Sequence, residues 1–329
     1  MPTVSKPDAT VGPDVTAPID NASPPPVDAL VDSKPPNTTG CNPGHFLAQR
    51  VAPEVLLVFD RSSAMRRQAT GSTQTRWVEM TDGVAEVLMQ KQAVASWGLK
   101  LFPTSTACMV SDGVDVPVGS AAFNDVITRI RGTIPAMGSE GSPIHQAVLT
   151  ALVGFPAAAK PRFFVLASDG LPGCPVGEPG ESKAYDAVRT AAAQGVRTFV
   201  VGTATAGSPQ HTMLNELATS GREPRAGDTR YFAAQNKTQM VQALNEITDQ
   251  LTSCLFSVTP APPSPNFVAM EIAGARVPRD QNQVDGWNYG ADMGAGSKTI
   301  RVYGSACAKL RANAAAPVEM IYGCPGVNP

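Results

Sequence analysis

The sequence has few aromatic residues, few charged residues and no long apolar run. Aromatic residues make up 6% of the 329 positions and charged residues 16%, and 26 Lys plus Arg nearly balance 28 Asp plus Glu, for a formal net charge of −2. This balance excludes a nucleic-acid binder that relies on a strongly basic face. No stretch approaches the ~18 consecutive apolar residues of a membrane-spanning helix, so we expect no transmembrane segment.

Sequence signatures of catalysis are also missing. The three histidines, His45, His145 and His211, stand apart from any pattern that would pair them with a nucleophile. The chain contains no Gly-x-Ser-x-Gly elbow, no Gly-rich dinucleotide fingerprint and no phosphate loop. We therefore predict that the protein is not an enzyme. A hydrolase that uses Asp60, Ser62 or Ser142 is the alternative that the residues leave open.

Six cysteines lie far apart in the sequence: Cys41, Cys108, Cys174, Cys254, Cys307 and Cys324. No two of them have the two- to four-residue spacing of a zinc or redox motif. An even number of scattered cysteines favours structural disulfides formed in an oxidising compartment. Six buried, reduced thiols in a cytosolic protein are the alternative interpretation.

Residues 1–40 are rich in proline and contain no aromatic residue. Such a segment cannot bury enough apolar surface to offset its ordering entropy, so we predict a disordered linker that tethers the rest of the chain. A tail with no tethering role is the alternative. The segment has neither the apolar core nor the basic start of a signal peptide, so we expect a removed export signal or a lipid-modified cysteine upstream.

Residues 41–254 are predicted to form an α/β domain. Glu54–Asp60 and Phe163–Asp169 are continuous apolar runs that end in Asp, and Val196–Gly202 is a third apolar run. Such runs are typical of strands buried on both faces of a parallel sheet. Because segments with helical spacing of apolar residues lie between them, we predict a doubly wound, mostly parallel sheet covered by helices on both faces.

Residues 255–329 differ in kind from the preceding domain. Asn266–Ile272, Lys298–Tyr303 and Val318–Tyr322 are strand-like runs separated by Gly, Pro, Asn and Asp, and no helical pattern lies between them. The spacing predicts a small antiparallel β module.

Polar side chains follow the ends of the predicted parallel strands. Asp60 and Ser62 come after the first strand, Ser142 precedes a helix, and Asp169 ends a later strand. Because ligands bind open parallel sheets beyond the carboxyl ends of the strands, we expect these four residues to meet there. Two carboxylates and two hydroxyls form an oxygen-lined site suited to Mg²⁺, which often takes a further carboxylate from outside.

These segments resemble von Willebrand factor type A (vWA) domains, most closely those of secreted bacterial proteins. The run Val55–Met65 is similar to the opening strand and Asp-x-Ser-x-Ser loop of the family's metal-ion-dependent adhesion site. Gly141-Ser142-Pro143 and Leu166–Gly170 resemble its second and third elements, and the likeness spans residues 54–253. The resemblance implies a vWA-like fold, Mg²⁺ at the four site residues and a protein ligand that offers a carboxylate.

One departure from the family motif weakens the predicted metal site. Ala64 stands where the family has its second Ser and provides no oxygen, whereas Ser142 replaces the usual Thr and keeps the hydroxyl. Loss of one ligand should lower the affinity for Mg²⁺, although water can fill the position. A structural vWA domain with an inactive metal site is therefore an alternative.

Purely structural roles, without a metal or a partner, are alternatives for the same residues. Ser142 before Pro143 suits a helix N-cap, and Asp60 and Asp169 suit carboxylates that accept backbone N–H groups of loops. Four arginines near the first loop either attract an acidic partner or form a solvated surface: Arg61, Arg66, Arg67 and Arg76.

The resemblance and the predicted topology also imply a disulfide pattern. Cys41 and Cys254 flank the α/β domain, whose ends the family brings together, so we predict that they pair. Cys108 and Cys174 lie in loops expected at the site edge, and Cys307 and Cys324 follow strands of the β module. The predicted pairs are Cys41–Cys254, Cys108–Cys174 and Cys307–Cys324.

The sequence thus leads to the hypothesis of an exported, non-enzymatic adhesion or scaffold protein of the cell envelope, periplasm or extracellular surface. Its predicted partner is a protein and not a nucleic acid. A subunit of an enzyme assembly is the rival class, because vWA-like domains also occur in metal-inserting complexes.

Overall fold

The computed structural model describes residues 44–104, 108–138, 141–155, 160–170, 174, 180–292 and 298–323. The predicted linker (1–40), Cys41 and Cys324 lie outside these ranges. Within the described ranges, no helix combines the length and the apolar character that crossing a bilayer requires.

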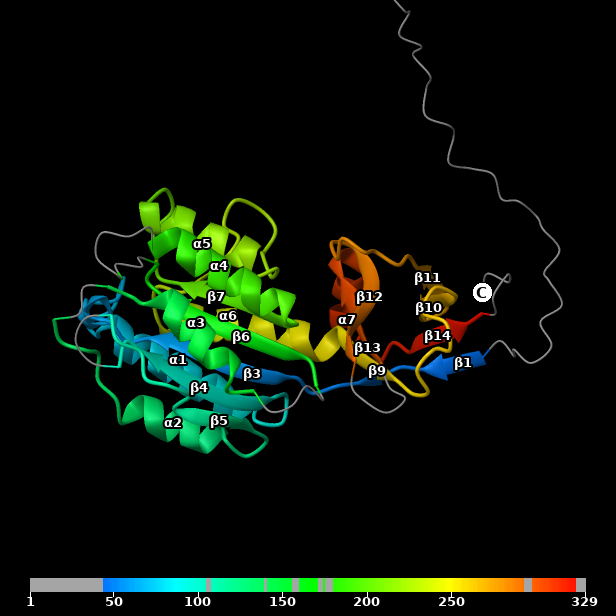
Figure 1. The fold of residues 1–329 in the computed structure, drawn as a ribbon, viewed down its shortest axis with the longest axis horizontal. Coiled ribbons are helices and arrows are strands. Elements are labelled where there is room, and N and C mark those ends of the chain that lie inside the picture. The colour runs from blue at the N-terminus through cyan, green and yellow to red at the C-terminus, as the bar shows by residue number, and fades with distance from the viewer. Residues whose placement is uncertain are drawn as a thin grey trace, which may run out of the picture. The chain divides into compact units, whose positions relative to one another are not determined.

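A six-stranded sheet forms the centre of an α/β domain (Figure 1). Its strands lie in the order β5 (Val116–Gly119), β4 (Ser96–Phe102), β3 (Glu54–Asp60), β6 (Arg162–Ser168), β7 (Val196–Gly202) and β8 (Phe232–Ala233). All neighbouring strands run parallel except β5, which pairs antiparallel with β4. The predicted fold class, a mostly parallel α/β sheet, is confirmed.

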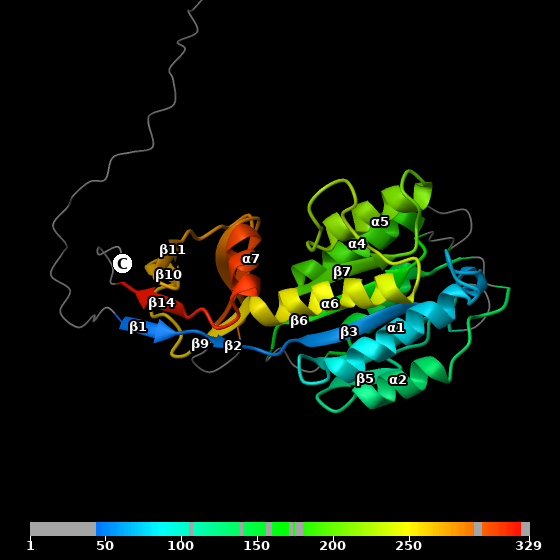
Figure 2. The same cartoon turned by 180° about the vertical axis from the view of Figure 1, so that it is seen from behind.

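Helices cover both faces of this sheet. One face carries α1 (Arg76–Gln90), α2 (Phe123–Arg131) and α6 (Lys237–Ser253), and the other carries α3 (Ile144–Leu152), α4 (Gly180–Ala193) and α5 (Pro209–Ser220), as the two opposite views show (Figures 1 and 2). The all-apolar sequence of β3 explains the double cover: Leu57 packs into the first core and Leu56 into the second. Successive strand side chains point to opposite faces, so both faces need a helical layer.

The β module consists of two antiparallel four-stranded sheets. One sheet has the order β1 (Gly44–Leu47), β14 (Val318–Tyr322), β10 (Val268–Ile272) and β11 (Ala275–Val277), and the other has β12 (Gly286–Asp292), β13 (Lys298–Tyr303), β9 (Leu255–Val258) and β2 (Gln49–Arg50). Met320 of the first sheet and Ile300 of the second belong to one buried core. The module also contains α7 (Gly304–Ala312), so the prediction that it lacks a helix was wrong.

The β module is built from both sides of the α/β domain in the sequence. β1 and β2 precede the domain, yet they pair with β14 and β9, which follow it. The α/β domain is therefore inserted between β2 and β9. Residues 44–50, which the sequence analysis assigned to the domain 41–254, share their hydrogen bonds with the β module instead.

Two disulfides stabilise the described part of the chain. Cys108 pairs with Cys174, as predicted, and Cys254 pairs with Cys307 with their Cα atoms 5.4 Å apart. The second disulfide shows that the predicted pairs Cys41–Cys254 and Cys307–Cys324 are wrong, because each cysteine forms one disulfide. The prediction joined the ends of the α/β domain to each other, whereas both ends pass into the β module. There α7 brings Cys307 to the end of α6.

Candidate functional site at the carboxyl edge of the sheet

The candidate site lies where β3 and β6 end, near the middle of the central sheet. β3 ends at Asp60, and β6 ends at Ser168 immediately before Asp169. From β3 the sheet continues through β4 and β5 on one side and through β6, β7 and β8 on the other. Open α/β sheets bind ligands at such a switch point, where loops from both directions diverge and leave a crevice.

The Asp60 carboxylate is fully buried and connects three segments of the chain. Its Oδ1 accepts a hydrogen bond from the Ser62 backbone N–H at 2.8 Å. Its Oδ2 accepts hydrogen bonds from the hydroxyls of Ser142 at 2.6 Å and Ser168 at 2.8 Å. Residues 82 and 108 positions away in the sequence therefore meet at this one carboxylate.

The hydroxyl of Ser142 serves Asp60 and not the following helix. α3 begins at Ile144 with Pro143 in the N-cap position, and no side chain caps it. The N-cap interpretation of Ser142 was therefore wrong. Sequence reasoning also missed Ser168, although a hydroxyl at the end of an otherwise apolar, buried strand was a usable signal.

Asp169, the last of the four predicted site residues, lies close enough to Asp60 to influence its charge. Burial, followed by the negative charge of Asp169, raises the pKa of Asp60 to about 6. The Arg76 guanidinium lies 3.9 Å from Asp169 Oδ2. Gly170 has a φ of 94°, and a Cβ at this position would lie 2.9 Å from Leu214 Cγ. The turn that presents Asp169 therefore requires glycine.

The donor set fits a weak Mg²⁺ site. The Ser62 hydroxyl is buried and has no hydrogen-bond partner among the described residues, which is unusual for a buried polar group and indicates a missing partner. Within the described ranges, no three His, Cys, Asp or Glu side chains form a metal-binding group. An ion here would depend on two carboxylates and on hydroxyl oxygens, the ligand type that Mg²⁺ prefers. Ala64, in the short helix η1 (Ser63–Arg66), adds no ligand.

A small cavity opens beside Asp169. It has a volume of about 120 Å³, and Arg67, Arg76 and Ser208 line it together with Asp169. Two guanidiniums at this position can receive a carboxylate from outside through charge-assisted hydrogen bonds. Of the four arginines that the sequence analysis singled out, Arg67 and Arg76 thus line a cavity next to the site.

The other two of these arginines hold loops in place. Arg61 donates hydrogen bonds to the carbonyls of Pro103 at 2.7 Å and Ile134 at 3.2 Å. Arg66 donates to the carbonyl of Pro135 at 3.1 Å. These guanidiniums therefore fasten the loops that follow β4 and α2 to the loop that carries Ser62.

Exposed apolar side chains lie on the fastened loops. Met109 is 62% exposed, and Ile134 and Met137 are each 69% exposed. Cys108, next to Met109, ties its loop to Cys174. Apolar side chains are therefore exposed on loops that are fastened at this edge of the sheet.

No protein-family model matches the sequence, and no curated protein matches it. Solved structures similar to the chain include an aerotolerance-related membrane protein from Bacteroides fragilis, with a TM-score of 0.44 and 17% identity over 60% of this chain and 99% of that one. The pilus adhesin SpaC from Lactobacillus rhamnosus GG has a TM-score of 0.46 and 11% identity over 84% of this chain and 39% of its own.

The VWA domain of SpRpn10 is similar over 60% of this chain and 95% of its own length, with a TM-score of 0.41 and 10% identity. These similarities are distant. The assignment of a layered α/β fold with a mostly parallel sheet therefore rests on the strand order and the two helical layers. The candidate site rests on the convergence of Asp60, Ser142 and Ser168.

Proposed function

We propose that the α/β domain is a non-enzymatic, exported module that binds a partner protein at the carboxyl edge of its sheet, with Mg²⁺ held by Asp60, Ser62, Ser142 and Asp169. The observation that carries this proposal is the buried Ser62 hydroxyl, which has no hydrogen-bond partner among the described residues and belongs to the residue whose backbone N–H binds Asp60, the neighbour of Asp169. The bound ion supplies positive charge and an open coordination position for a carboxylate of the partner.

The residues of this chain have distinct roles in the proposal. Ser142 and Ser168 orient the Asp60 carboxylate through their hydrogen bonds. The Arg76 guanidinium forms an ion pair with Asp169. Together with Arg67 it also lines the cavity through which an outside carboxylate would approach.

The surroundings of the site indicate what kind of partner fits. Met109, Ile134 and Met137 offer apolar contact area, while Arg67 and Arg76 offer charge. A protein surface with an Asp or Glu surrounded by apolar residues would complement both features. The two disulfides favour an oxidising compartment outside the cytoplasm, where such partners are envelope or extracellular proteins.

The melting temperature tests metal binding directly. We expect millimolar Mg²⁺ to raise the melting temperature of the wild-type protein, because an ion that binds only the folded state stabilises it. Ala64→Ser should enlarge this shift, and Asp60→Asn should abolish it. Asp186→Asn, which changes a carboxylate with 72% side-chain exposure in α4, should respond like wild type. Equal melting temperatures with Mg²⁺ and with chelator for wild type and Ala64→Ser would contradict the metal site.

Partner binding needs a separate measurement. We expect proteins of a cell-envelope extract to crosslink to the immobilised protein in Mg²⁺ and not in chelator. The crosslinks should form through a photoreactive residue placed at Ile134 or Met137. Loss of the same bands in Asp60→Asn, with retention in Asp186→Asn, would tie them to the site. If the crosslinked bands were equally strong with Mg²⁺ and with chelator, and in wild type and Asp60→Asn, the result would show that partner binding does not depend on the ion.

A metal-free scaffold is the second candidate, and one observation favours it. Arg76 already places a positive charge 3.9 Å from Asp169, so part of the negative charge is balanced without an ion. In that case Arg76→Gln, and not chelation, would weaken partner binding. The same crosslinking experiment therefore separates the two candidates.

A further inference from the structure

Among the described residues, the junction between the α/β domain and the β module contains a cluster of two positive charges and one negative charge with little exposure to solvent. Glu223, which follows α5, accepts two hydrogen bonds from the Arg301 guanidinium of β13, one of them at 2.6 Å. Arg197 of β7 lies 3.4 Å from the same carboxylate. The side chains of Arg197, Glu223 and Arg301 are 16%, 6% and 9% exposed, so two guanidiniums share one carboxylate away from water.

Aromatic rings fix this cluster in place. The guanidinium carbons of Arg197 and Arg301 lie 5.4 and 5.3 Å from the centre of the Tyr303 ring. Arg301 also lies 5.1 Å from the centre of the Phe163 ring. Because removing an ion from water is costly unless it is paired, the second guanidinium creates a demand for an anion at this junction.

Two cavities adjoin the cluster and share Arg222, Arg301 and Tyr303 as lining residues. One has a volume of about 520 Å³ and the other about 210 Å³. The described residues that line them include six arginines and two glutamates: Arg162, Arg197, Arg222, Arg225, Arg301, Arg311, Glu223 and Glu246. This is an excess of four positive charges in a chain whose formal net charge is −2.

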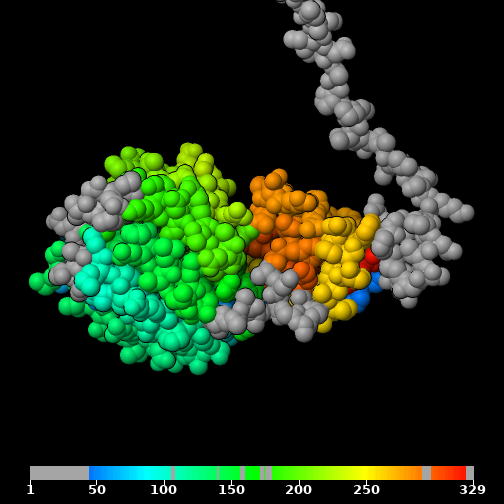
Figure 3. Space-filling model, in the orientation of Figure 1, coloured from blue at the N-terminus to red at the C-terminus, as the bar shows by residue number. Residues whose placement is uncertain are grey.

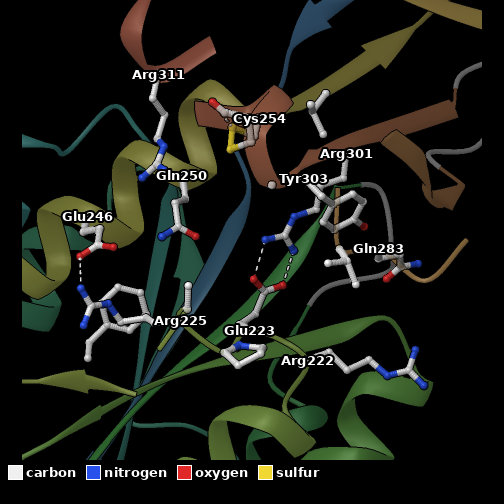
Figure 4. Close-up of a pocket in the computed structure, with 17 residues that line it drawn as sticks. Arg222, Glu223, Arg225, Glu246, Gln250, Cys254, Gln283, Arg301, Tyr303 and Arg311 are labelled. Atoms are coloured by element: carbon white, nitrogen blue, oxygen red, sulfur yellow. Dashed lines mark hydrogen bonds and ion pairs between the residues drawn. A yellow bond between two sulfur atoms is a disulfide. The ribbon is translucent and has the colours of Figure 1, made fainter. Parts of the chain in front are cut away.

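The arginines of the larger cavity approach it from both parts of the molecule. Arg311 extends from α7 of the β module toward Gln250 of α6, while Arg222 and Arg225 come from the α/β domain (Figure 4). Arg225 is paired with Glu246 at 3.3 Å. The side chains of Arg222 and Arg311 have no ion pair or hydrogen bond with any residue in the described ranges. In the space-filling view, the orange atoms of the β module adjoin the green atoms of the α/β domain (Figure 3).

Nearby acidic groups outside the lining already have other partners. The Asp280 carboxylate accepts hydrogen bonds from the backbone N–H groups of Asn282, Val284 and Asp285. Asp285 itself binds Ser305 at the start of α7. Glu54 is the exception: its buried Oε2 has no hydrogen-bond partner among the described residues, and its carboxylate lies in the field of Lys160 and of Arg162, which lines the smaller cavity. None of these contacts offsets Arg222 or Arg311.

We propose that this junction is a second binding site, which takes a small organic anion with two or more carboxylate or phosphate groups. Arg222, Arg225 and Arg311 bind its anionic groups, in the field of the buried Arg197–Arg301 pair. A cavity of about 520 Å³ is in the range of small-molecule sites. Gln250 and Gln283 supply further hydrogen bonds, and Phe232 and the Cys254–Cys307 disulfide contact the apolar part of the ligand.

Calorimetric titration of the full chain tests this site with defined probes. The probes are citrate, inorganic pyrophosphate and acetate at equal ionic strength, in buffer freed of divalent cations because citrate and pyrophosphate chelate Mg²⁺. We expect saturable binding of citrate, of pyrophosphate or of both, at least about tenfold tighter than acetate, because several charge-assisted hydrogen bonds form at once. The tighter probe identifies the carboxylate or the phosphate class.

Variants with matched charge decide whether the junction is the site. The double variant Arg222→Gln/Arg311→Gln should weaken binding about tenfold or more. Arg131→Gln/Arg276→Gln removes the same charge from exposed positions elsewhere and should change the affinity less than twofold. Glu246→Gln removes a competing carboxylate and should tighten binding. Asp60→Asn should bind citrate and pyrophosphate with wild-type affinity. The result of this titration therefore does not depend on whether the proposed Mg²⁺ site exists.

Three outcomes would overturn the proposal. They are the absence of saturable binding of citrate and pyrophosphate, acetate binding as tightly as either, and equal losses in the two double variants. Because Arg222 and Arg311 are exposed side chains, their variants should keep the wild-type circular dichroism spectrum and melting temperature.

Discussion

The two ends of the central sheet carry charge clusters of opposite sign. At the carboxyl ends of the strands, Asp60 and Asp169 lie close together, and the Arg76 guanidinium approaches Asp169. At the amino ends of β6 and β7, Arg197 and Arg301 share the single carboxylate of Glu223. Both clusters are buried, so water screens neither of them as it screens a surface ion pair.

The two ends differ in what holds the central carboxylate. Among the described residues, the donors to Asp60 are neutral groups, and burial with the nearby Asp169 raises the pKa of Asp60 to about 6. Glu223 instead binds a guanidinium with both of its oxygens. Neutralising Asp60 at the carboxyl end should therefore stabilise the protein, whereas neutralising Glu223 at the amino end should destabilise it.

The largest effect is expected at the amino end of the sheet. Glu223→Gln leaves two buried guanidiniums without a carboxylate, and we expect it to lower the free energy of unfolding by about 3–5 kcal/mol. Urea denaturation measures this loss. Glu246→Gln, whose ion pair with Arg225 is 38% exposed on the Glu side, should cost less than about 1 kcal/mol. If Glu223→Gln and Glu246→Gln lowered the free energy of unfolding by similar amounts, the result would contradict the burial of the Glu223 cluster.

Removing the Cys254–Cys307 disulfide should have the next largest effect. The double variant Cys254→Ala/Cys307→Ala frees a loop of 53 residues, and we expect a loss of about 2–4 kcal/mol, measured by denaturant unfolding under non-reducing conditions. Cys108→Ala/Cys174→Ala, with a separation of 66 residues, should cost a similar amount. Peptide mapping without reduction checks the connectivity itself. Recovery of a peptide that joins Cys41 to Cys254 would refute the pairing described above.

At the carboxyl end, the metal-free protein should become less stable as the pH rises. The folded-state pKa of Asp60 is about 6 and its ordinary value is 3.8, so folding favours the protonated carboxyl. The stability from this group is complete below about pH 3.8 and is lost as the pH rises through about 6.

Asp60→Asn should remove this part of the pH dependence and stabilise the metal-free protein near pH 7 by about 1–3 kcal/mol. The amide oxygen can still accept from the Ser62 N–H, and the amide nitrogen can donate to the serine hydroxyls. Unfolding by urea at several pH values, with divalent cations removed, measures both effects. If Asp60→Asn destabilised the metal-free protein at pH 7, the claim that the ionised Asp60 carboxylate is unfavourable in the folded state would be wrong.

The smallest effects should distinguish the two serines near Asp60. Ser62→Ala removes a hydroxyl without a partner, so without metal we expect a change of about 1 kcal/mol or less, neutral or stabilising. Ser168→Ala removes a hydrogen bond to Asp60 and should cost about 1–2 kcal/mol. With Mg²⁺ present, Ser62→Ala should lose the stabilisation by the ion. Retained Mg²⁺ stabilisation in Ser62→Ala would remove this hydroxyl from the ligand set.

Much of the carboxyl edge was predictable because local patterns specify it. An apolar strand with an Asp at its end or directly after it marks both the sheet and its edge, which is why Asp60 and Asp169 could be placed at this edge from the sequence. Ser142 was found as well, although two roles were open for it. Only the structure shows that its hydroxyl belongs to Asp60, because that choice depends on where α3 begins.

The junction could not be predicted from local patterns. Arg197 and Arg301 are single charged residues within otherwise largely apolar strands, and nothing in the neighbouring sequence shows which charge each of them meets. They are buried because β13 faces the amino ends of β6 and β7, a contact between segments about a hundred residues apart. The wrong disulfide predictions have the same origin, since pairing of β2 with β9 carries both ends of the α/β domain into the β module.

By itself the sequence determined the layered α/β domain, the β strands after it and the carboxylate pair at the sheet edge. Each of these follows from hydrophobic periodicity and from the direction of parallel strands, which act over a few residues at a time. The tertiary structure decided which cysteines pair, how the first strands join the last ones and which charges lose contact with water. Burial and pairing depend on neighbours far away in the chain, and no local pattern encodes them.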